Sequence, residues 1–462
     1  MKRLLFSLLF LASCRPCLQP EFHMQEQFTE QKRIDEMEGT KVDLVCWWAQ
    51  FKDPLLTELI ESALSQNLDI QIARERICQA RAEYGVEFSR LLPQIDLDGF
   101  FQRNRNPSTE GDSPFLGGGF ENFYRVGFDA AWELDIFGKL RDRAKAAALD
   151  ALSQQELLRY VNLSITSEVA IDYFLIRNLQ DRIAITRSHI QSASELVETT
   201  EIRYDIGLIP ELDVYTARAL LKTRYADLAE LQARLQETIF GLGVLLGQMP
   251  DTLIHAFDEP RTYEIHEADI PVGLPSELLC RRGDVRAAEL AMLASGARVK
   301  AERKELFPVL SLEGLYKYST SFFTYWFTPG SRLWQIQPTS LMPIFRGGQI
   351  LSKIAVATSK QHQAALNYEQ TVLEAVEEVE SSLIAYFQEH IRVKELIEQT
   401  ENYRYARKLA DSLYSAGLVN FLFLFELEKQ LYTSQIVESE GRELLRARLV
   451  SIFKALGGGW EC

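Results

Sequence analysis

The sequence has little of what catalytic and metal-binding proteins need. Its 462 residues include six histidines and six cysteines, and no histidine stands in an H-E-x-x-H or other metal-ligand spacing. Neither a P-loop nor a G-x-S-x-G nucleophile motif is present. Acidic neighbours such as Glu377-Glu378 lie in a charged helical segment, where solvation accounts for them. We therefore predict that the chain is not an enzyme and holds no metal and no cofactor.

Positive charge and long apolar runs are also lacking. Lys and Arg number 50 against 65 Asp and Glu, so the formal net charge is −15, which disfavours nucleic acid as a partner. Apolar residues make up 47% of the chain, which excludes wholesale disorder. After the N-terminus, no apolar run approaches the ~20 residues with which a helix spans a bilayer. If the chain crosses a membrane, it must do so with strands.

The N-terminus has the pattern of a secretory signal. A basic start at 1–3 precedes an apolar stretch at 4–11 and two small residues, which predicts a signal peptide over 1–13. The tetrapeptide Leu11-Ala12-Ser13-Cys14 also resembles the lipobox of bacterial lipoproteins. That resemblance implies that Cys14 becomes the acylated first residue of a lipid-anchored N-terminal segment, 14–55. The alternative is an ordinary signal with an unrelated cysteine.

The chain contains the same long segment twice. Residues 139–206 and 349–416 are two stretches of 68 residues without Gly or Pro, and each leads into a Tyr-x-x-Gly turn. An internal duplication is therefore expected. These landmarks divide the chain into repeat 1 (56–249), a connector with four prolines (250–275), repeat 2 (276–457) and a C-terminal tail (458–462).

Both stretches are predicted to be long helices. They are rich in Ala, Leu, Glu, Gln, Lys and Arg, and apolar residues recur every seven positions in the first of them, at Ile176, Ile183, Ile190 and Val197. At 1.5 Å per residue, 68 residues reach ~100 Å, more than twice the ~40–45 Å of a bilayer, so most of each helix must stand in water. A second helix returns after each turn. The prediction is two helical hairpins, at about 139–247 and 349–456.

A period of two precedes each hairpin. Apolar residues alternate with polar or small residues over 124–135, and 95–103 is the expected partner strand. In the second repeat, 309–318 and about 333–342 have the same roles. The prediction is a helix and then two strands in each repeat, with the strands at about 94–135 and 309–342 and the loops at 103–122 and 319–332.

The number of strands bears on assembly. Four strands cannot close a barrel, and lipid does not tolerate open strand edges. Two chains would give eight strands, whose interior is filled by side chains, whereas three chains give twelve and can leave a lumen. A conduit built from this chain is therefore expected to be at least trimeric.

Five motifs carry a resemblance to a known family. In this sequence they are Trp132–Arg141 (WELDIFGKLR), Gly273–Leu279 (GLPSELL), Arg281–Glu289 (RRGDVRAAE), Pro343–Gly348 (PIFRGG) and Ala455–Trp460 (ALGGGW). With them the chain resembles the TolC-like outer-membrane efflux proteins, of the lipoprotein branch that serves resistance-nodulation-division pumps. The resemblance implies a mixed α and β membrane protein, a homotrimer in which a twelve-stranded outer-membrane β-barrel is continued by an α-helical coiled-coil tunnel through the periplasm.

The resemblance also implies a function and partners. The function is that of a passive duct, which carries small molecules from an inner-membrane pump across periplasm and outer membrane. The partners are two further copies of the chain, a periplasmic adaptor (membrane fusion) protein, the inner-membrane pump and outer-membrane lipid. Alternatives are a non-conducting coiled-coil lipoprotein spacer, the exit duct of a protein secretion system, and a surface-anchored hydrolase. The alternating strands argue against the spacer, and the missing catalytic motifs argue against the hydrolase.

The two hairpin turns are the predicted docking sites for the adaptor. They are Gly207-Leu208-Ile209-Pro210 and Gly417-Leu418-Val419-Asn420. Turns at the ends of hairpins this long place apolar groups furthest from the membrane, and exposed apolar patches usually have a partner. The run 422–427 is more apolar than the family pattern and lacks one carboxylate, which leaves the identity of the docking partner open. The alternative is that both segments are simple turns.

Acidic residues near the turns predict a gate. Asp411 and Glu201 each lie six residues before a turn glycine. Three copies of each would surround the tunnel end with six carboxylates, and the family resemblance implies closure there through acidic residues. Arg407 or Arg404 could bridge such a ring. The alternative is that Asp411 and Arg407 form an exposed i, i+4 pair worth only ~0.3–0.5 kcal/mol.

Overall fold

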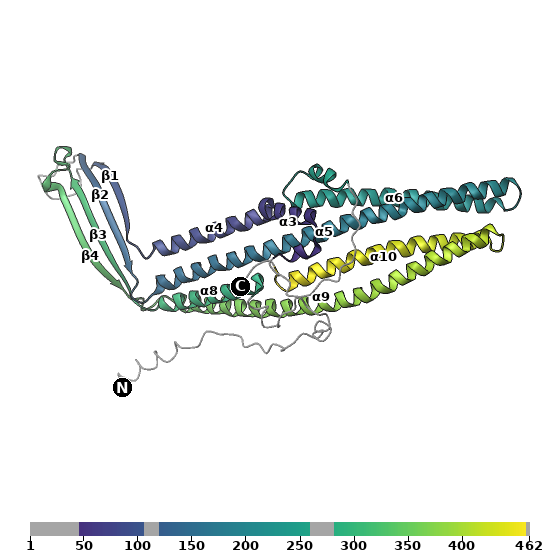
Figure 1. Ribbon diagram of the computed structural model, residues 1–462. Helices are drawn as coiled ribbons and strands as arrows, with labels where there is room; N and C mark the ends of the chain where they lie inside the picture. Colours follow the sequence, from purple (N-terminus) through teal and green to yellow (C-terminus); the bar gives the residue numbers. More distant parts are fainter. Residues whose placement is uncertain (1–45, 106–119, 259–280, 459–462) are drawn as a thin grey trace, which may run out of the picture. The chain divides into compact units, whose positions relative to one another are not determined.

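A computed structural model describes residues 46–105, 120–258 and 281–458 (Figure 1). The described chain forms two compact units. The first contains 75–105, 120–155 and 287–369, and the second contains 46–74, 156–258, 281–286 and 370–458. The predicted signal peptide, Cys14 and most of the segment 14–55 lie outside the described residues, as do most of loop 103–122 and residues 259–275 of the predicted connector.

The first unit contains an antiparallel sheet of four strands in sequence order. The strands are β1 (Gln94–Arg105), β2 (Phe120–Leu134), β3 (Val309–Thr320) and β4 (Arg332–Leu341). Strand β2 begins four residues before the predicted alternation, because its first residues continue the ladder with the end of β1, from Asn122↔Arg103 to Phe120↔Arg105. The strands thus occupy the regions predicted from the period of two.

The register gives the sheet two unlike faces, because directly paired residues share a face. One, the apolar face, carries Ile95, Leu97, Phe101, Tyr124, Val126, Phe128, Trp132, Leu312, Tyr316, Tyr318, Trp334 and Ile336. The other, the polar face, carries Asp96, Asp98, Arg125, Asp129, Glu313, Lys317, Gln335 and Gln337. The apolar face is open, with Trp334 71% and Ile336 68% exposed.

On the polar face, one lysine joins three strands. The ammonium of Lys317 on β3 lies 2.7 Å from Asp98 on β1 and 2.5 Å from Asp129 on β2. Lys317 is buried because it crosses directly over Gly127, where a Cβ would lie 2.4 Å from the Cα of Lys317. The absence of a side chain at Gly127 is therefore what allows this ion pair to form.

The motif at 132–141 makes the turn from strand to helix. The carboxylate of Asp135 accepts hydrogen bonds from the backbone N–H groups of Leu140 (3.1 Å) and Arg141 (2.9 Å), and so satisfies donors at the start of helix α5 (Lys139–Asp205). Gly138 takes φ +78°, which favours glycine. The indole of Trp132 donates to the Leu91 carbonyl at 2.8 Å and holds β2 against the residues before β1.

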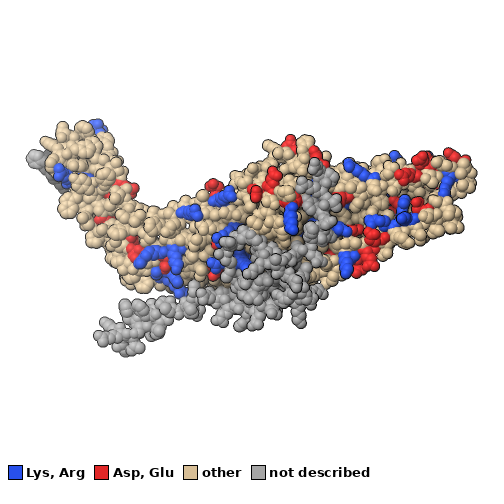
Figure 2. Space-filling view, in the orientation of Figure 1, with Lys and Arg blue, Asp and Glu red and all other residues tan. Residues whose placement is uncertain are grey.

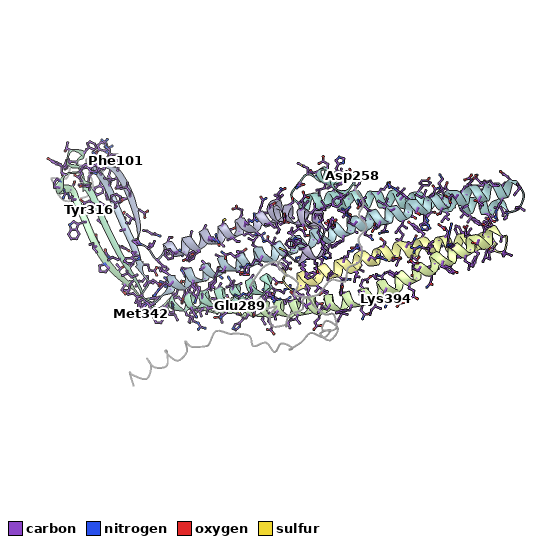
Figure 3. All side chains as sticks on the ribbon, viewed as in Figure 1. Phe101, Asp258, Glu289, Tyr316, Met342 and Lys394 are labelled. Atoms are coloured by element: carbon purple, nitrogen blue, oxygen red, sulfur yellow. The ribbon has the colours of Figure 1, made fainter. Side chains whose placement is uncertain are left out.

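The first unit also holds parts of four helices, α4 (Leu68–Ser89), α5, α8 (Gly283–Lys304) and α9 (Gln349–Ser415). Met342 lies where the sheet ends toward these helices (Figure 3). No helix in the described part of the chain is both long and apolar enough to span a membrane.

The second unit is built on the two predicted hairpins. Helix α5 pairs with α6 (Glu211–Leu245), and α9 pairs with α10 (Phe421–Ala455). Each turn has the Schellman pattern: the N–H of Gly207 donates to Tyr204 (2.8 Å) and that of Leu208 to Arg203 (2.9 Å), and Gly417 and Leu418 repeat it with Tyr414 and Leu413. Gly207 (φ +75°) and Gly417 (φ +73°) meet the backbone requirement of this motif, which explains the recurring Tyr-x-x-Gly.

One helix of repeat 1 is divided, contrary to the single helix expected there. Helix α3 (Pro54–Gln66) ends at Asn67, and α4 begins at the next residue. The side chain of Asn67 accepts from the Ile70 N–H (2.9 Å) and donates to the Leu245 carbonyl (2.7 Å). A long-range partner therefore fixes this break, which the helical periodicity did not indicate.

A core of aromatic and aliphatic side chains joins the helices of the second unit. Trp47, from the short 3-10 helix η1 (Trp47–Phe51), is fully buried and stacks on Phe453 with ring centroids 5.5 Å apart. Arg282 is also buried; its guanidinium binds Asp284 (2.7 Å), Glu378 (2.7 Å) and the Ala455 carbonyl (3.0 Å). The Arg-Arg-Gly-Asp motif thus ties the start of α8 to α9 and α10.

Two smaller findings concern the connector and the cysteines. The first part of the predicted connector is a 3-10 helix, η2 (Pro250–Phe257), which buries Leu253 and Phe257. Cys46 and Cys78 are free and exposed thiols, and the other four cysteines lie outside the described residues.

Candidate functional site

The hairpin turns carry exposed apolar side chains. In the first, Ile206 is 65%, Leu208 69% and Leu212 72% exposed, and in the second Leu418 is 73% and Leu422 63% exposed. We call these five residues the tip surface. Proline and asparagine begin the returning helices: Pro210 is the N-cap of α6, and the Asn420 side chain accepts from the Phe423 N–H at 3.0 Å. Hydrogen bonds within the turns satisfy their backbone groups. The exposed apolar side chains are therefore not needed to form the turns.

The apolar run at the second turn has two roles. Phe421 and Leu424 are buried and pack with Tyr414, Ala410 and Ala217 in a small core near the turns. Leu422 and Phe423 point outward and are exposed. Within the run 422–427, Leu424 thus belongs to this small core, and Leu422 belongs to the tip surface.

The predicted gate residues have unlike surroundings. Glu201 binds the Arg218 guanidinium (2.6 Å), which holds it against α6. Asp411 is exposed and forms no ion pair with any residue in the described ranges. Arg404 binds Glu401 within one turn of α9, and Arg407 binds Glu428 on α10 at 2.9 Å. Within one chain, therefore, neither arginine bridges Asp411, and the i, i+4 pair considered as the alternative is not formed.

Arg407 belongs to a buried network that the sequence analysis did not identify. Glu428, 4% exposed, accepts from Arg407 through Oε2 and contacts His189 Nδ1 at 2.8 Å through Oε1. His189 Nε2 lies 2.6 Å from Gln435 Oε1. Burial would raise the pKa of Glu428, but His189 and Arg407 outweigh it, so the pKa of this carboxyl lies below its ordinary value. The network connects α5, α9 and α10.

A sequence signal for this network existed. The repeats are offset by 210 residues, since Gly207 corresponds to Gly417, so Arg407 stands where repeat 1 has Val197 of the seven-residue series. A cation at a coiled-coil core position needs a buried partner. The same region has a second polar contact between hairpins, in which the Arg224 guanidinium lies 3.4 Å from the ring centroid of Tyr432.

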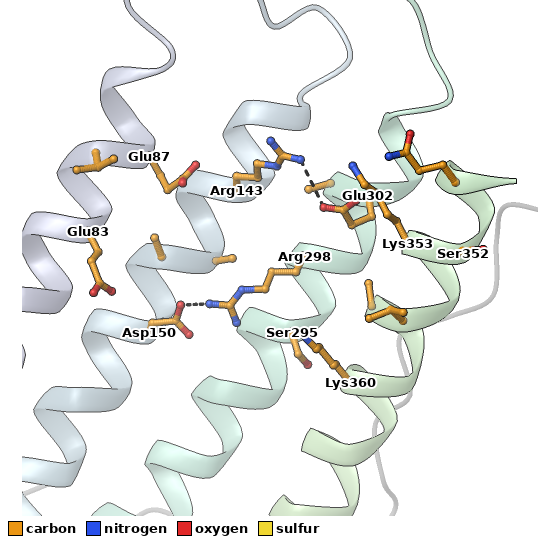
Figure 4. A pocket seen from close by; sticks show the side chains of 17 residues that line it. Glu83, Glu87, Arg143, Asp150, Ser295, Arg298, Glu302, Ser352, Lys353 and Lys360 are labelled. Carbon is orange, nitrogen blue, oxygen red and sulfur yellow. Dashed lines mark hydrogen bonds and ion pairs between the residues drawn. The ribbon is translucent and has the colours of Figure 1, made fainter. Parts of the chain in front are cut away.

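A cleft of about 980 Å³ lies among α4, α5, α8 and α9 of the first unit (Figure 4). Two ion pairs join charged side chains that line it. Arg143 binds Glu302 (3.4 Å) and Glu305 (2.8 Å), Arg298 binds Asp150, and alanines form part of the wall. Nothing in this arrangement pairs a nucleophile with a base. Among the described residues, no cluster of His, Cys, Asp or Glu is arranged to hold a metal ion.

Charges are distributed unevenly over the surface. Acidic and basic side chains intermix along the helical hairpins, and the sheet shows few of either on the face in view (Figure 2). A sheet with an open apolar face and a polar opposite face, in a chain that also forms long hairpins with apolar tips, is the arrangement expected of an outer-membrane channel subunit.

The comparison with known sequences identifies the family. The profile of the outer membrane efflux protein family matches residues 59–248 and 274–458. The chain is 30% identical over 423 residues to the solvent efflux pump outer membrane protein SrpC of Pseudomonas putida, covering 89% of this chain and 87% of that protein. The chain belongs to the outer membrane efflux protein family, as its motifs predicted.

Solved structures agree. The outer-membrane channel OprN is 28% identical, with a TM-score of 0.83 and coverage of 96% of this chain and 100% of that chain. The CmeC outer membrane channel of Campylobacter jejuni has a TM-score of 0.90 with 97% and 95% coverage; at 22% identity it shows the fold. The protein is thus an outer-membrane efflux channel, and the predicted location in the outer membrane is confirmed.

Proposed function

We propose that three copies of the chain assemble into a passive duct that an inner-membrane pump loads through a periplasmic adaptor. The observation that carries the trimer is the open sheet: it begins at β1 and ends at β4, and its apolar face is exposed. Strand edges cannot face lipid unpaired, so β4 of one copy would pair with β1 of the next. Three copies give twelve strands, enough to leave a lumen lined by the polar faces.

The duct supplies no energy and carries out no reaction in this proposal. Its family is one of efflux channels, and two ion pairs, Arg143–Glu302 and Arg298–Asp150, join charged groups of the cleft in the first unit. Transport would then be driven by the pump, and substrate choice would rest there as well, because a wide water-filled lumen discriminates little between small molecules.

The gate proposal rests on Asp411 and Glu201. Asp411 is exposed and unpaired within the described part of the chain, so in a trimer three Asp411 carboxylates could face the lumen with the Glu201 groups nearby. Arg404 and Arg407 of neighbouring copies remain the candidate bridges, although each has a carboxylate partner in its own chain.

Planar-bilayer recordings of the purified protein test both duct and gate. We expect step openings from the wild type, and a higher single-channel conductance with weaker cation preference from the double variant Asp411→Ala, Glu201→Ala. Without the carboxylates, the arginine bridges that close the narrow end cannot form, and the anionic ring that attracts cations is lost. Glu230→Ala, which removes an exposed acid of α6 outside the predicted gate, is the control. Silence of the wild type under every opening condition would favour the spacer; unchanged conductance and selectivity in the double variant would place the gate elsewhere.

The adaptor proposal rests on the tip surface. Exposed apolar side chains on satisfied turns are the kind of patch that binds a partner protein. The docking segments would be Gly207-Leu208-Ile209-Pro210 and Gly417-Leu418-Val419-Asn420, as the sequence suggested.

Site-specific cross-linking can test this docking. A photoreactive residue at Leu208 or Leu418 should capture the adaptor in cells, because both side chains are exposed at the ends of the hairpins. The same probe at Phe101, at the hairpin end of β1, is the matched control (Figure 3). Adaptor adducts from Phe101 and none from the two turns would refute the assignment.

The lipid anchor is a separate proposal. The lipobox-like Leu11-Ala12-Ser13-Cys14 motivates cleavage before Cys14 and its acylation. The intact mass of the mature wild type should exceed that of a chain beginning at residue 14 by the mass of its acyl groups, and Cys14→Ser should lose this increment. Cys17→Ser serves as the control and should keep it. An unacylated mature mass in the wild type would disprove the anchor.

A further inference from the structure

The connection between β3 and β4 folds onto the apolar face of the sheet. It contains two short 3-10 turns, η3 (Phe323–Tyr325) and η4 (Pro329–Ser331). The ring of Tyr124 lies 5.6 Å from Phe323 and 5.4 Å from Trp326 between centroids. Tyr124 is on the apolar face, so the connection turns away from the polar face that would line a lumen.

The same connection exposes large aromatic rings. Phe322 and Phe323 are each 66%, Tyr325 60% and Phe327 61% exposed. Phe327 has φ +69°, a backbone conformation that a bulky residue rarely adopts. Its ring stacks on Trp326 (5.0 Å, 24°) and contacts Tyr318 (5.3 Å), so packing on the apolar face compensates the strain.

Three arginines lie on the apolar face at the same end of the sheet. Arg103 and Arg105 are near the end of β1, with guanidinium carbons 4.4 Å and 5.8 Å from the ring centroid of Phe120, and Arg332 is the first residue of β4. Register places Arg332 beside Tyr318 and Arg105 beside Phe120. In the described chain no carboxylate pairs with any of the three. Cations on a lipid-facing surface are costly unless anionic groups meet them.

We propose that this end of the apolar face, which we call the aromatic–arginine band, binds the phosphate groups of lipid A in the outer leaflet. The band consists of Arg103, Arg105, Phe322, Phe323, Tyr325, Trp326, Phe327 and Arg332. The hairpin ends of the sheet point away from the helices (Figure 1). In an outer-membrane channel the helices stand in the periplasm, so this end of the sheet, and with it the band, would lie at the outer leaflet. It continues the lipid-facing surface of the sheet, and aromatic rings are suited to the boundary between acyl chains and headgroups.

Assembly would complete the site, in a step that rests on the proposed trimer. Pairing of β4 with β1 of the next copy brings Arg332 of one chain to the edge that carries Arg103 and Arg105 of its neighbour. Each seam would then present three guanidinium groups to one phosphorylated headgroup. Arginine suits this task because its planar donors bind phosphate in pairs.

Native mass spectrometry of the full-length protein tests the band. The probes are lipid A, phosphatidylglycerol and phosphatidylcholine, added to the protein in detergent. We expect lipid A to bind the wild type at least ~10-fold more tightly than the variant Arg103→Gln, Arg105→Gln, Arg332→Gln. Arg125→Gln, which removes an arginine of the polar face, is the matched control and should bind like the wild type.

The same spectra report the oligomeric mass, so failure of the trimer is distinguished from failure of the band. Equal lipid A binding by the triple variant and the wild type would overturn the proposal. An equal loss in Arg125→Gln would also overturn it, because the face would then not matter. Phosphatidylglycerol bound as tightly as lipid A, with the same arginine dependence, would overturn the choice of lipid A.

Fluorescence in proteoliposomes tests the aromatic part. Brominated phospholipids should quench the emission of Trp326, which is measured as the difference between the wild type and Trp326→Phe. The reason is that the connection between β3 and β4 would lie at the lipid boundary. Trp334→Phe is the positive control, since Trp334 lies on the apolar face and is 71% exposed. If brominated lipid quenches a larger fraction of the emission in Trp326→Phe than in the wild type while the Trp334 control responds, the emission removed came from a tryptophan that lipid does not reach, and the connection does not contact lipid.

Discussion

Replacing Gly127 by Val should prevent the sheet from forming. An added Cβ at this position would lie 2.3 Å from the Tyr316 carbonyl oxygen and 2.4 Å from the Cα of Lys317, and both are backbone atoms that cannot move without breaking the β2–β3 ladder. It would also displace the Lys317 side chain from Asp98 and Asp129. We expect a loss of about 3 kcal/mol or more, seen as near-complete loss of folded protein from the outer membrane.

The matched control is Gly99→Val on the neighbouring strand β1. Gly99 has nothing within 4 Å of an added Cβ, and it lies on the apolar face, where valine suits a lipid-facing position. Its variant should reach the outer membrane in wild-type amounts. If Gly127→Val is inserted and as stable as Gly99→Val, the close crossing of Lys317 over this glycine is not present in the protein.

Replacing Glu428 by Gln should strongly destabilise the two hairpins. The carboxylate is buried and pairs with Arg407 at 2.9 Å and with His189 at 2.8 Å. The amide keeps the shape but leaves the Arg407 cation without its counter-charge. Because the Arg407 side chain is 31% exposed, we expect less than the ~3–5 kcal/mol that breaking a fully buried pair costs. We expect the thermal midpoint of the helical circular dichroism signal to fall by several degrees.

The pH dependence of the destabilisation by Glu428→Gln follows from the direction in which the pKa of Glu428 is shifted. The pKa of Glu428 is lower in the folded protein than in the unfolded chain, so its stabilisation is fully present above the unfolded value and is lost as pH falls through the folded value. The part of the difference between wild type and Glu428→Gln that comes from the Glu428 charge should therefore shrink in acid, below about pH 4.

Glu426→Gln, two residues earlier on α10, is the control. Glu426 is exposed and accepts a hydrogen bond from Gln430 of its own helix, so its loss should change the midpoint little. Equal midpoints for Glu426→Gln and Glu428→Gln at neutral pH would show that the buried network contributes no stability.

The sequence by itself determined the elements and their order. A stretch of 68 residues without Gly or Pro has no local reason to stop being helical, and the two such stretches formed helices of 67 residues, Lys139–Asp205 and Gln349–Ser415. The turns at Gly207 and Gly417 were predictable because helices commonly end at a residue with left-handed backbone conformation, and glycine adopts that conformation most readily. Alternation over 124–135 set the two faces of β2, because neighbouring residues of a strand point to opposite sides.

Only the tertiary structure decided which side chains meet. Arg407 was expected to bridge Asp411, four residues away, yet it binds Glu428 on the returning helix. His189, 239 residues before Glu428 in the sequence, contacts the same carboxylate. Asn67 divides α3 from α4 through the distant Leu245 carbonyl, and the aromatic connection after β3 lies on the apolar face because Tyr124 and Tyr318 receive it there. Periodicity and turn chemistry depend on residues close in sequence, whereas the partner of a buried charge depends on which helices pack together, and no local pattern encodes that choice.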